Sequence, residues 1–363
     1  MKNKSYVGAA AVILLWIFLT VAAWLHQSET ISESERRKLA QFPDVSVSTV
    51  LSGEFASDFE AFATDQFPLR DLFRQGKALF HYYVLGQKDN NGIYLTDGYA
   101  AKLEYPMNEQ SVRSAVDHFN RLYEMYLQDT AGNIYMSVVP DKGYYLAEQN
   151  GYPAMDYEAL FATVREGVPW AEYIDLTGAL EAGDYYRTDT HWRQERIGNA
   201  AQRLAEAMGV SVGEFAPTAL EKPFYGVYYG QAALPMQPET MYLMESELLS
   251  QCTVYNHETG KTAAVYDLEK LTSRDLYDVF LSGAAALLTI ENPSGQPGKE
   301  LVVFRDSFGS AMIPLLVQDY STVTVIDTRY IAADLVGNYV NLQGKDVLFL
   351  YSTLILNNSS SLK

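Results

Sequence analysis

The chain contains 363 residues, of which 48% are hydrophobic and 13% aromatic, so it can build a large core and disorder is not the default. Its formal net charge is -18 at pH 7, and such a surface repels phosphate backbones, so nucleic acid is not expected as a partner. The single cysteine, Cys252, excludes an intrachain disulfide and a cysteine-rich metal site.

The N-terminal segment is predicted to anchor the chain in a membrane. The residues from Tyr6 to Leu25 carry no charge, and as a helix they would span about 30 Å, the thickness of a bilayer core. A cleaved signal peptide is the alternative, although its apolar region is normally shorter. Lys2 and Lys4 precede the segment and no Lys or Arg follows before Arg36, which favours a globular part outside the cytoplasm.

Three regions are expected along the chain. They are an anchor at residues 1–27, a polar linker at 28–53, and one extracytoplasmic α/β domain at 54–363. Phenylalanines at i, i+4 and i+7 from Phe55 to Phe62 predict an amphipathic helix, and a second helix is expected from Leu69 to about Tyr83. Residues 215–298 are rich in Tyr, Pro and polar residues and are interpreted as an inserted cap.

The body of the domain has the pattern of an α/β fold. Continuous apolar runs predict strands, and these runs lie at 133–139, 301–304, 323–326 and 347–350. Helix-like segments near 309–318 and 330–341 separate the last three, and a helical pattern from Val112 to Tyr126 precedes the first. Apolar strands with helical crossovers are typical of a mostly parallel sheet covered on both faces, so a three-layer α/β/α domain is expected.

A serine follows one of these apolar strands. The sequence Phe304-Arg305-Asp306-Ser307-Phe308-Gly309 takes the chain from a strand through a serine into a helix. Such a turn exposes the hydroxyl at the carboxyl end of the sheet, where the amides at a helix N-terminus can meet a developing oxyanion. The alternative is an ordinary helix cap, for which Asp and Ser are common residues.

A second candidate feature is the pair Asp189 and His191 in the sequence Asp189-Thr190-His191-Trp192. An Asp two residues before a His can orient the imidazole, which can then act as a general base toward a serine supplied elsewhere. The alternative is a capping Asp beside a surface His. A zinc site is not expected, because one His with scattered carboxylates lacks the paired ligand spacing.

The Asp189–Trp192 sequence resembles the Asp-His-His-Trp motif of the DHHW proteins, with Thr190 in place of the first His. These proteins resemble the alginate O-acetyltransferases and, more distantly, the SGNH hydrolases, with Asp-x-His placed before the serine in a permuted motif order. The segment Arg305–Phe308 is similar to the Gly-Asp-Ser-Phe nucleophile block, with Arg305 in place of Gly. Other resembling segments, in the same order, are Gly53-Glu54-Phe55, Asp65–Asp71, Asn91–Tyr94 and Pro140-Asp141-Lys142.

The resemblance implies an SGNH hydrolase-like fold and a role for each motif residue. Ser307 would be the nucleophile, His191 the base and Asp189 the residue that orients it. Gly283 could supply an oxyanion amide, but Ala284 stands where the family's Asn side chain is expected, and losing one such donor costs about 10²–10³ in rate.

Four further residues are candidate substrate contacts. Trp192 and Tyr228 can stack on sugar rings or simply pack, while Lys142 and Arg305 can point at the site, although Lys142 can also only cap a turn.

The resemblance implies an O-acetyltransferase acting on a cell-surface polysaccharide or exopolysaccharide. No cofactor is expected, and a membrane-bound O-acyltransferase would be the partner that supplies the acyl group. An esterase with the same triad is one alternative. A non-catalytic glycan-binding or scaffold protein on this fold is the other, because a fold does not determine a function.

Overall fold

The computed structural model describes residues 2–25, 27–32, 34–130 and 132–363. Contacts divide the chain into two compact units. The first comprises Met1–Asn91 with Tyr229–Met236, and the second comprises Gly92–Tyr228 with Gln237–Lys363. We expected the α/β domain to begin at residue 54, whereas residues 54–91 belong to the first unit.

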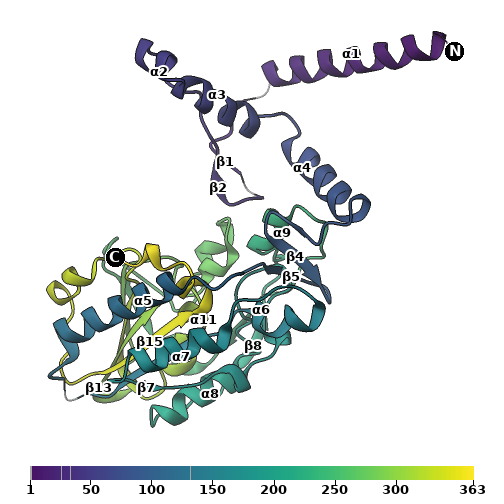
Figure 1. Ribbon diagram of the computed structural model, residues 1–363. Helices are drawn as coiled ribbons and strands as arrows, with labels where there is room; N and C mark the ends of the chain where they lie inside the picture. Colours follow the sequence, from purple (N-terminus) through teal and green to yellow (C-terminus); the bar gives the residue numbers. More distant parts are fainter. Residues whose placement is uncertain (1, 26, 33, 131) are drawn as a thin grey trace. The chain divides into compact units, whose positions relative to one another are not determined.

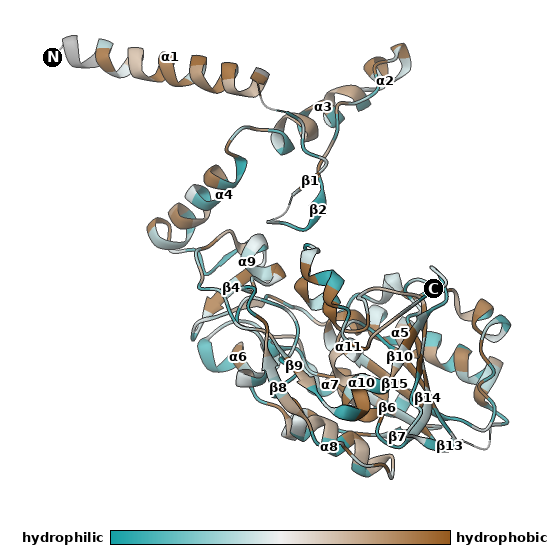
Figure 2. Ribbon diagram, turned by 180° about the vertical axis from the view of Figure 1, so that it is seen from behind, coloured by the Kyte–Doolittle hydropathy of each residue, from teal (hydrophilic) through white to brown (hydrophobic). Residues whose placement is uncertain are grey.

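The first unit begins with the helix α1 (Lys2–Leu25), which is long and apolar enough between Tyr6 and Ala23 to cross a membrane by length and composition (Figure 1). Figure 2 shows hydrophobic residues along most of its length. The unit's other elements are short: β1 (Ile31–Ser32), β2 (Arg37–Lys38), α2 (Val47–Ser52), α3 (Glu54–Asp65), α4 (Arg70–Leu79), the π-helical turn η1 (Phe80–Val84) and β3 (Asp89–Asn90). The helices α3 and α4 confirm the two helices predicted around Pro68.

The second unit is built on one eight-stranded sheet with the strand order β11-β10-β12-β14-β13-β15-β6-β7. Its strands are β6 (Ile134–Val139), β7 (Glu172–Tyr173), β10 (Thr253–Asn256), β11 (Lys261–Ala263), β12 (Leu287–Glu291), β13 (Gln296–Arg305), β14 (Tyr320–Ile326) and β15 (Asp346–Ser352). All pairs from β14 to β7 are parallel. The prediction of a mostly parallel sheet containing the four apolar runs is therefore confirmed.

The segment interpreted as an insertion supplies one edge of this sheet. The strands β10, β11 and β12 lie within residues 215–298 and pair antiparallel with one another and with β14. The polar composition of this segment fits an exposed edge, because antiparallel strands tolerate one solvated face. Two further antiparallel strand pairings lie outside this sheet: β4 (Ile93–Thr96) with β5 (Tyr99–Lys102), and β8 (Ala216–Ala219) with β9 (Tyr242–Glu245).

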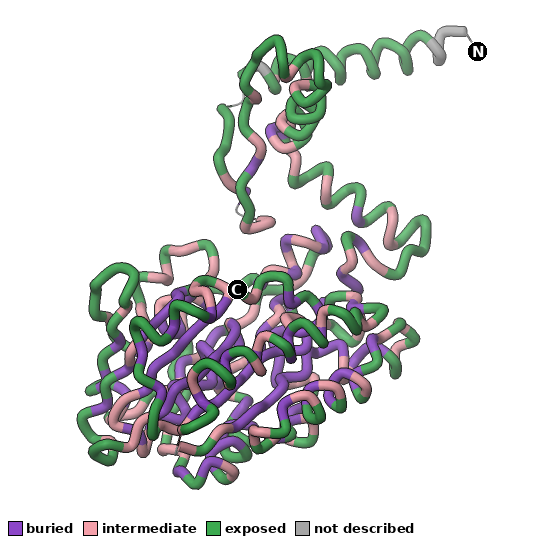
Figure 3. The backbone as a smooth tube through the Cα atoms, turned by 60° about the vertical axis from the view of Figure 1, so that its left-hand side comes forward, coloured by how far each residue is buried: buried purple, intermediate pink, exposed green. Residues whose placement is uncertain are grey.

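Alternation along the central strands divides the core between the two faces of the sheet. Along β13, Leu301 and Val303 join one hydrophobic cluster, while Val302 and Phe304 join the other. Buried residues of α8 (Gly198–Ala207) belong to the first cluster, and those of α5 (Glu109–Leu122) and α7 (Tyr157–Gly167) belong to the second. Figure 3 shows the resulting buried strands in the middle of this unit.

The remaining helices are short. They are α6 (Lys142–Leu146), α9 (Val227–Ala232), α10 (Glu247–Gln251), α11 (Gly309–Met312) and α12 (Thr353–Leu356). The segment expected as a helix near 309–318 is α11 followed by a 3-10 turn at Ile313–Leu316, where Pro314 removes a backbone donor. The segment near 330–341 contains only a 3-10 turn, Ala333–Asn338.

Candidate active site

Ser307 lies in the turn that follows the central strand β13. This strand pairs with β14 on one side and β15 on the other, so the turn lies at the carboxyl edge of the parallel part of the sheet. Asp306 holds the turn in place: its carboxylate accepts the N–H of Phe308 at 3.0 Å and the N–H of Ser352, at the end of β15, at 2.7 Å. The fully buried Asp306 therefore fixes where the neighbouring half-buried serine points.

Asp189, His191 and Ser307 form one hydrogen-bonded chain. The Asp189 Oδ1 atom lies 2.6 Å from His191 Nδ1, and His191 Nε2 lies 2.8 Å from Ser307 Oγ. With Nδ1–H donated to the buried carboxylate, Nε2 is left to accept the serine hydroxyl proton. This is the order of contacts that a nucleophilic serine, a general base and an orienting acid require.

Backbone contacts immobilise the Asp189 carboxylate, which has no solvent exposure. Its Oδ1 also accepts the N–H of His191 at 3.1 Å, and its Oδ2 accepts the N–H of Val227 at 2.8 Å. The chain beside it passes too close for a side chain, since a Cβ on Gly226 would lie 2.3 Å from the Asp189 Cα. A glycine at position 226 is thus needed for this approach.

Glu239 supports the same loop from a distant part of the sequence. Its carboxylate accepts the N–H groups of Arg187 and Thr188 at 2.8 and 2.9 Å, and the Thr188 hydroxyl at 2.9 Å. Thr188 Oγ1 in turn accepts the N–H of Gly226. Glu239 is not among the residues predicted from the sequence, because nothing in its local sequence distinguishes it from a surface glutamate.

Tyr277 packs flat against the imidazole. The centroids of the two rings are 3.9 Å apart and their planes are only 9° from parallel, and the centroid of the Phe308 ring lies 5.1 Å from that of His191. These contacts limit the rotation of the His191 side chain and so keep the imidazole in one orientation. No motif marked Tyr277, which lies in a 3-10 turn at Leu276–Val279.

Lys142 is buried against the segment that leads to Asp189 and is not exposed in an open site. It is 2% exposed, and its ammonium group donates to the carbonyls of Tyr186 at 2.7 Å and Arg187 at 3.3 Å. The same group lies over the Tyr228 ring, 5.1 Å from its centroid. The interpretation of Lys142 as a substrate contact is therefore revised: its contacts hold the segment that leads to Asp189.

Replacing Lys142 should alter how stability depends on pH. Burial lowers the pKa of Lys142 to about 7, although the nearby carboxylates of Asp189, Glu239 and Asp141 favour the charged form. An unfolded lysine keeps a pKa near 10.4, so between pH 7 and 10 the unfolded chain binds more protons and folding is favoured as pH rises. Below pH 7 both states are charged and the burial cost is fully present. The free energy of unfolding of the wild type, relative to that of Lys142→Met, should therefore rise by about 2–3 kcal/mol between pH 6 and pH 9.

Chemical denaturation at the two pH values measures this difference. Lys261→Met, at an exposed position, is the matched control. Its free energy of unfolding should differ from that of the wild type by the same amount at both pH values. Parallel curves for the wild type and Lys142→Met would contradict the prediction, because they would mean that Lys142 keeps its proton throughout.

Three other candidate substrate contacts are also buried. Trp192 has no exposure and its indole N–H donates to the Phe308 carbonyl, while Tyr228 donates its hydroxyl to Thr190 Oγ1. Arg305 is 1% exposed and lies 3.5 Å from Asp327 Oδ2. A side chain that contacts a sugar must be exposed to it, so these three assignments are revised to packing and support.

Gly283 is revised as well. Its N–H donates to the Phe280 carbonyl at 3.1 Å, and its own carbonyl accepts from Arg305 Nη2 at 3.3 Å. With φ at +81° it occupies a left-handed turn in which a glycine is favoured. An amide already used in this turn is not directed at an oxyanion, so Gly283 has a structural part here.

Within residues 2–25, 27–32, 34–130 and 132–363, no group of three or more His, Cys, Asp or Glu side chains is placed so that it could hold a metal ion.

The part of the chain that contains this site is similar to a known protein family. Residues 177–326 match the family model described as DHHW protein, and no curated protein matches the chain. The segment matched contains all three residues of the hydrogen-bonded chain.

Solved structures are similar over about three quarters of the chain. A DHHW family protein from Eubacterium siraeum DSM 15702 has 22% identity and a TM-score of 0.58, covering 75% of this chain and 95% of that one. Bacillus cereus PatB1 with a sulfonyl adduct has 16% identity and a TM-score of 0.58, covering 73% and 95%. The O-acetyltransferase domain of Pseudomonas putida AlgJ has 16% identity and a TM-score of 0.46, covering 73% and 92%. The first two establish the fold, and the family match over residues 177–326 confirms the predicted resemblance to the DHHW proteins.

Proposed function

We propose that this protein is a membrane-anchored O-acyltransferase that acetylates a hydroxyl of a cell-surface polysaccharide or exopolysaccharide. The observation that carries the proposal is the 2.8 Å contact between His191 Nε2 and Ser307 Oγ, with Asp189 behind the imidazole. The domain is taken to be a three-layer, SGNH-like fold in permuted motif order, outside the cytoplasm.

The chemistry follows from the order of these contacts. Ser307 Oγ attacks the acyl carbonyl and gives its proton to His191 Nε2, which passes it to the departing donor oxygen. The acyl group is then an ester on Ser307. An acceptor hydroxyl attacks this ester, His191 takes the hydroxyl proton, and the proton returns to Ser307 as the new ester leaves. Asp189 stabilises the imidazolium in both halves of the reaction.

The source of the acyl group gives a reason for anchoring the domain to the membrane. Acetyl-CoA is cytoplasmic, so a membrane-bound O-acyltransferase would carry the acyl group to the outer side. A tethered domain meets such a partner at high effective concentration. Protease added to intact protoplasts tests the side of the membrane: the globular part should be digested, and full protection would contradict an extracytoplasmic site.

Covalent labelling tests the nucleophile directly. Bacillus cereus PatB1 carries a sulfonyl adduct, and sulfonyl fluorides react with activated serines. Phenylmethylsulfonyl fluoride should add one sulfonyl group to the peptide containing Ser307, as read by mass spectrometry of the full chain in detergent. Denatured protein is the control and should stay unlabelled at this peptide.

The fate of the acetyl group separates the alternatives. With p-nitrophenyl acetate as donor and an oligosaccharide as acceptor, a transferase places acetyl on the sugar. Acetyl found only as free acetate would favour the esterase. An unlabelled Ser307 together with no turnover would favour a glycan-binding or scaffold protein, a reading that the Ala284 side chain, without an amide, also allows.

A further inference from the structure

The helix α4 and the turn η1 carry a continuous apolar face that is exposed. The side chains on this face recur three, four or seven residues apart and are 38% to 69% exposed: Leu72, Phe73, Leu79, Phe80, Tyr83 and Val84. Figure 2 shows the hydrophobic residues along this segment, and Figure 3 shows how much of it is exposed. A helix on a soluble protein turns such a face toward the core, so the usual orientation is inverted here.

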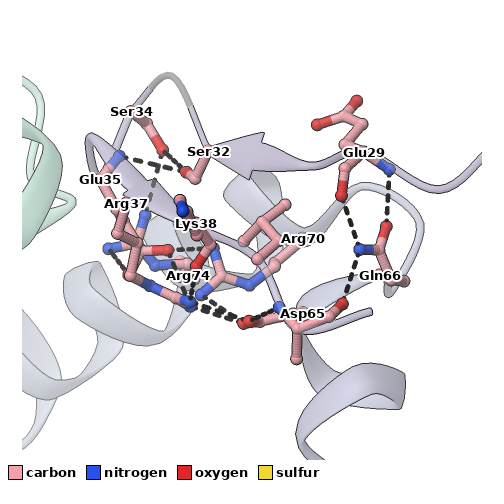
Figure 4. A network of polar contacts seen from close by, with 12 residues as sticks. Glu29, Ser32, Ser34, Glu35, Arg37, Lys38, Asp65, Gln66, Arg70 and Arg74 are labelled. Atoms are coloured by element: carbon pink, nitrogen blue, oxygen red, sulfur yellow. Dashed lines mark hydrogen bonds and ion pairs between the residues drawn. The ribbon is translucent and has the colours of Figure 1, made fainter. Parts of the chain in front are cut away.

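The two arginines of α4 lie on the side of the helix that faces inward. The side chains of Arg70 and Arg74 are only 17% and 16% exposed, and both pair with Glu35, Arg74 Nη2 at 3.3 Å (Figure 4). Arg74 Nη2 also donates to the carbonyl of Gly230 at 2.8 Å, and Ala78, on the same side, is fully buried. These contacts fix the rotation of the helix and leave its apolar face outward.

The exposed apolar residues are concentrated in this part of the chain. Outside α1, more large hydrophobic side chains are exposed between residues 42 and 85 than in all of residues 92–363 that the structure describes. Single exposed apolar residues are normal on a soluble surface, but a contiguous group marks contact with an apolar surface.

Two observations favour lipid as that surface. The same unit contains α1, which is long and apolar enough to cross a bilayer, so a membrane is close to the unit whenever α1 is inserted. The exposed charge beside this face also suits an anionic headgroup: Arg70 and Arg74 face inward against Glu35, whereas Lys77 is at the surface. Lys77 is exposed beside the apolar face, where its stem can lie on acyl chains while its ammonium reaches a phosphate.

We propose that α4 and η1 lie in the interfacial plane of the membrane in which α1 is inserted, with the apolar face against the acyl chains. The first unit would then be held by two contacts, one spanning and one lying on the surface. This proposal does not depend on the chemistry at Ser307.

Depth-dependent quenching tests this contact in the full chain. Single cysteines are introduced as Leu72→Cys, Phe80→Cys or Tyr83→Cys in a Cys252→Ser background and labelled with an environment-sensitive fluorophore. The protein is placed in nanodiscs of phosphatidylcholine and phosphatidylglycerol, one copy per disc, with or without nitroxide on the acyl chains. Gln75→Cys, an exposed polar position on the same helix, is the matched control.

Labels on the apolar face should emit at shorter wavelength than the Gln75 label and be strongly quenched by the nitroxide lipid. Water-like emission from these labels would overturn the proposal. Short-wavelength emission without quenching would also overturn it, because it would show that the face packs against protein. Each substitution replaces an exposed side chain, and circular dichroism verifies that the fold is kept.

Discussion

Ser307→Ala is expected to lower kcat for acetyl-ester turnover by roughly four to six orders of magnitude while leaving the fold intact. The variant removes the atom that receives the acyl group, and no other hydroxyl is hydrogen-bonded to His191 Nε2 among the contacts described. Because Ser307 is half-buried and its hydroxyl is not part of the turn's own hydrogen bonds, thermal unfolding should change little.

Ser321→Ala supplies the matched control. Its hydroxyl donates to the Lys299 carbonyl at the opposite end of the sheet, so the same atom is lost without any change near the imidazole. Turnover with p-nitrophenyl acetate, measured for both variants and the wild type, decides the outcome. Wild-type turnover by Ser307→Ala would remove the basis of the proposed function.

Asp189→Asn should lower kcat by about four orders of magnitude, and His191→Ala by at least as much. The carboxylate accepts Nδ1–H at 2.6 Å and so leaves Nε2 free to take the serine proton. An asparagine that presents its amide N–H to Nδ1 would stabilise the opposite tautomer, with the proton on Nε2. The base would then be blocked although the ring keeps its contacts with Tyr277 and Phe308.

Asp175→Asn controls for the loss of one negative charge. Asp175 also accepts an N–H two residues on, from Thr177, but it lies in an exposed turn without a histidine. Single-turnover kinetics should show the Asp189→Asn defect in acylation and none in Asp175→Asn. If kcat of Asp189→Asn falls by less than tenfold, the carboxylate holds the loop in place but does not set the tautomer of His191.

The prediction of the sheet succeeded where the pattern is local. The runs ending at Val139, Phe304, Ile326 and Leu350 are continuous and apolar because each strand is covered on both faces, and all four are strands of one sheet. The antiparallel strands β10 to β12, on one side of the sheet, fall in the segment interpreted as an insertion, because a strand with one solvated face carries a weaker pattern.

The roles predicted for single side chains differ from the structure where burial determines which contacts a side chain can make. The sequence favours substrate contacts for four residues because aromatic and cationic side chains bind sugars at exposed sites: Trp192, Tyr228, Lys142 and Arg305. Each is less than 5% exposed, and each makes its polar contacts within the protein. The residue type states which contacts are possible, whereas the surrounding packing selects one of them.

The sequence by itself determined the membrane-length helix, the four apolar strands and the two candidate motifs, because each depends on residues that are neighbours in the chain. Only the tertiary structure decided that His191 meets Ser307, 116 residues away, and that Tyr277 and Glu239 hold the imidazole and its loop. Such contacts depend on how the strands are ordered in the sheet and which loops reach its carboxyl edge. No local pattern encodes that order, because it results from burying the whole core at once.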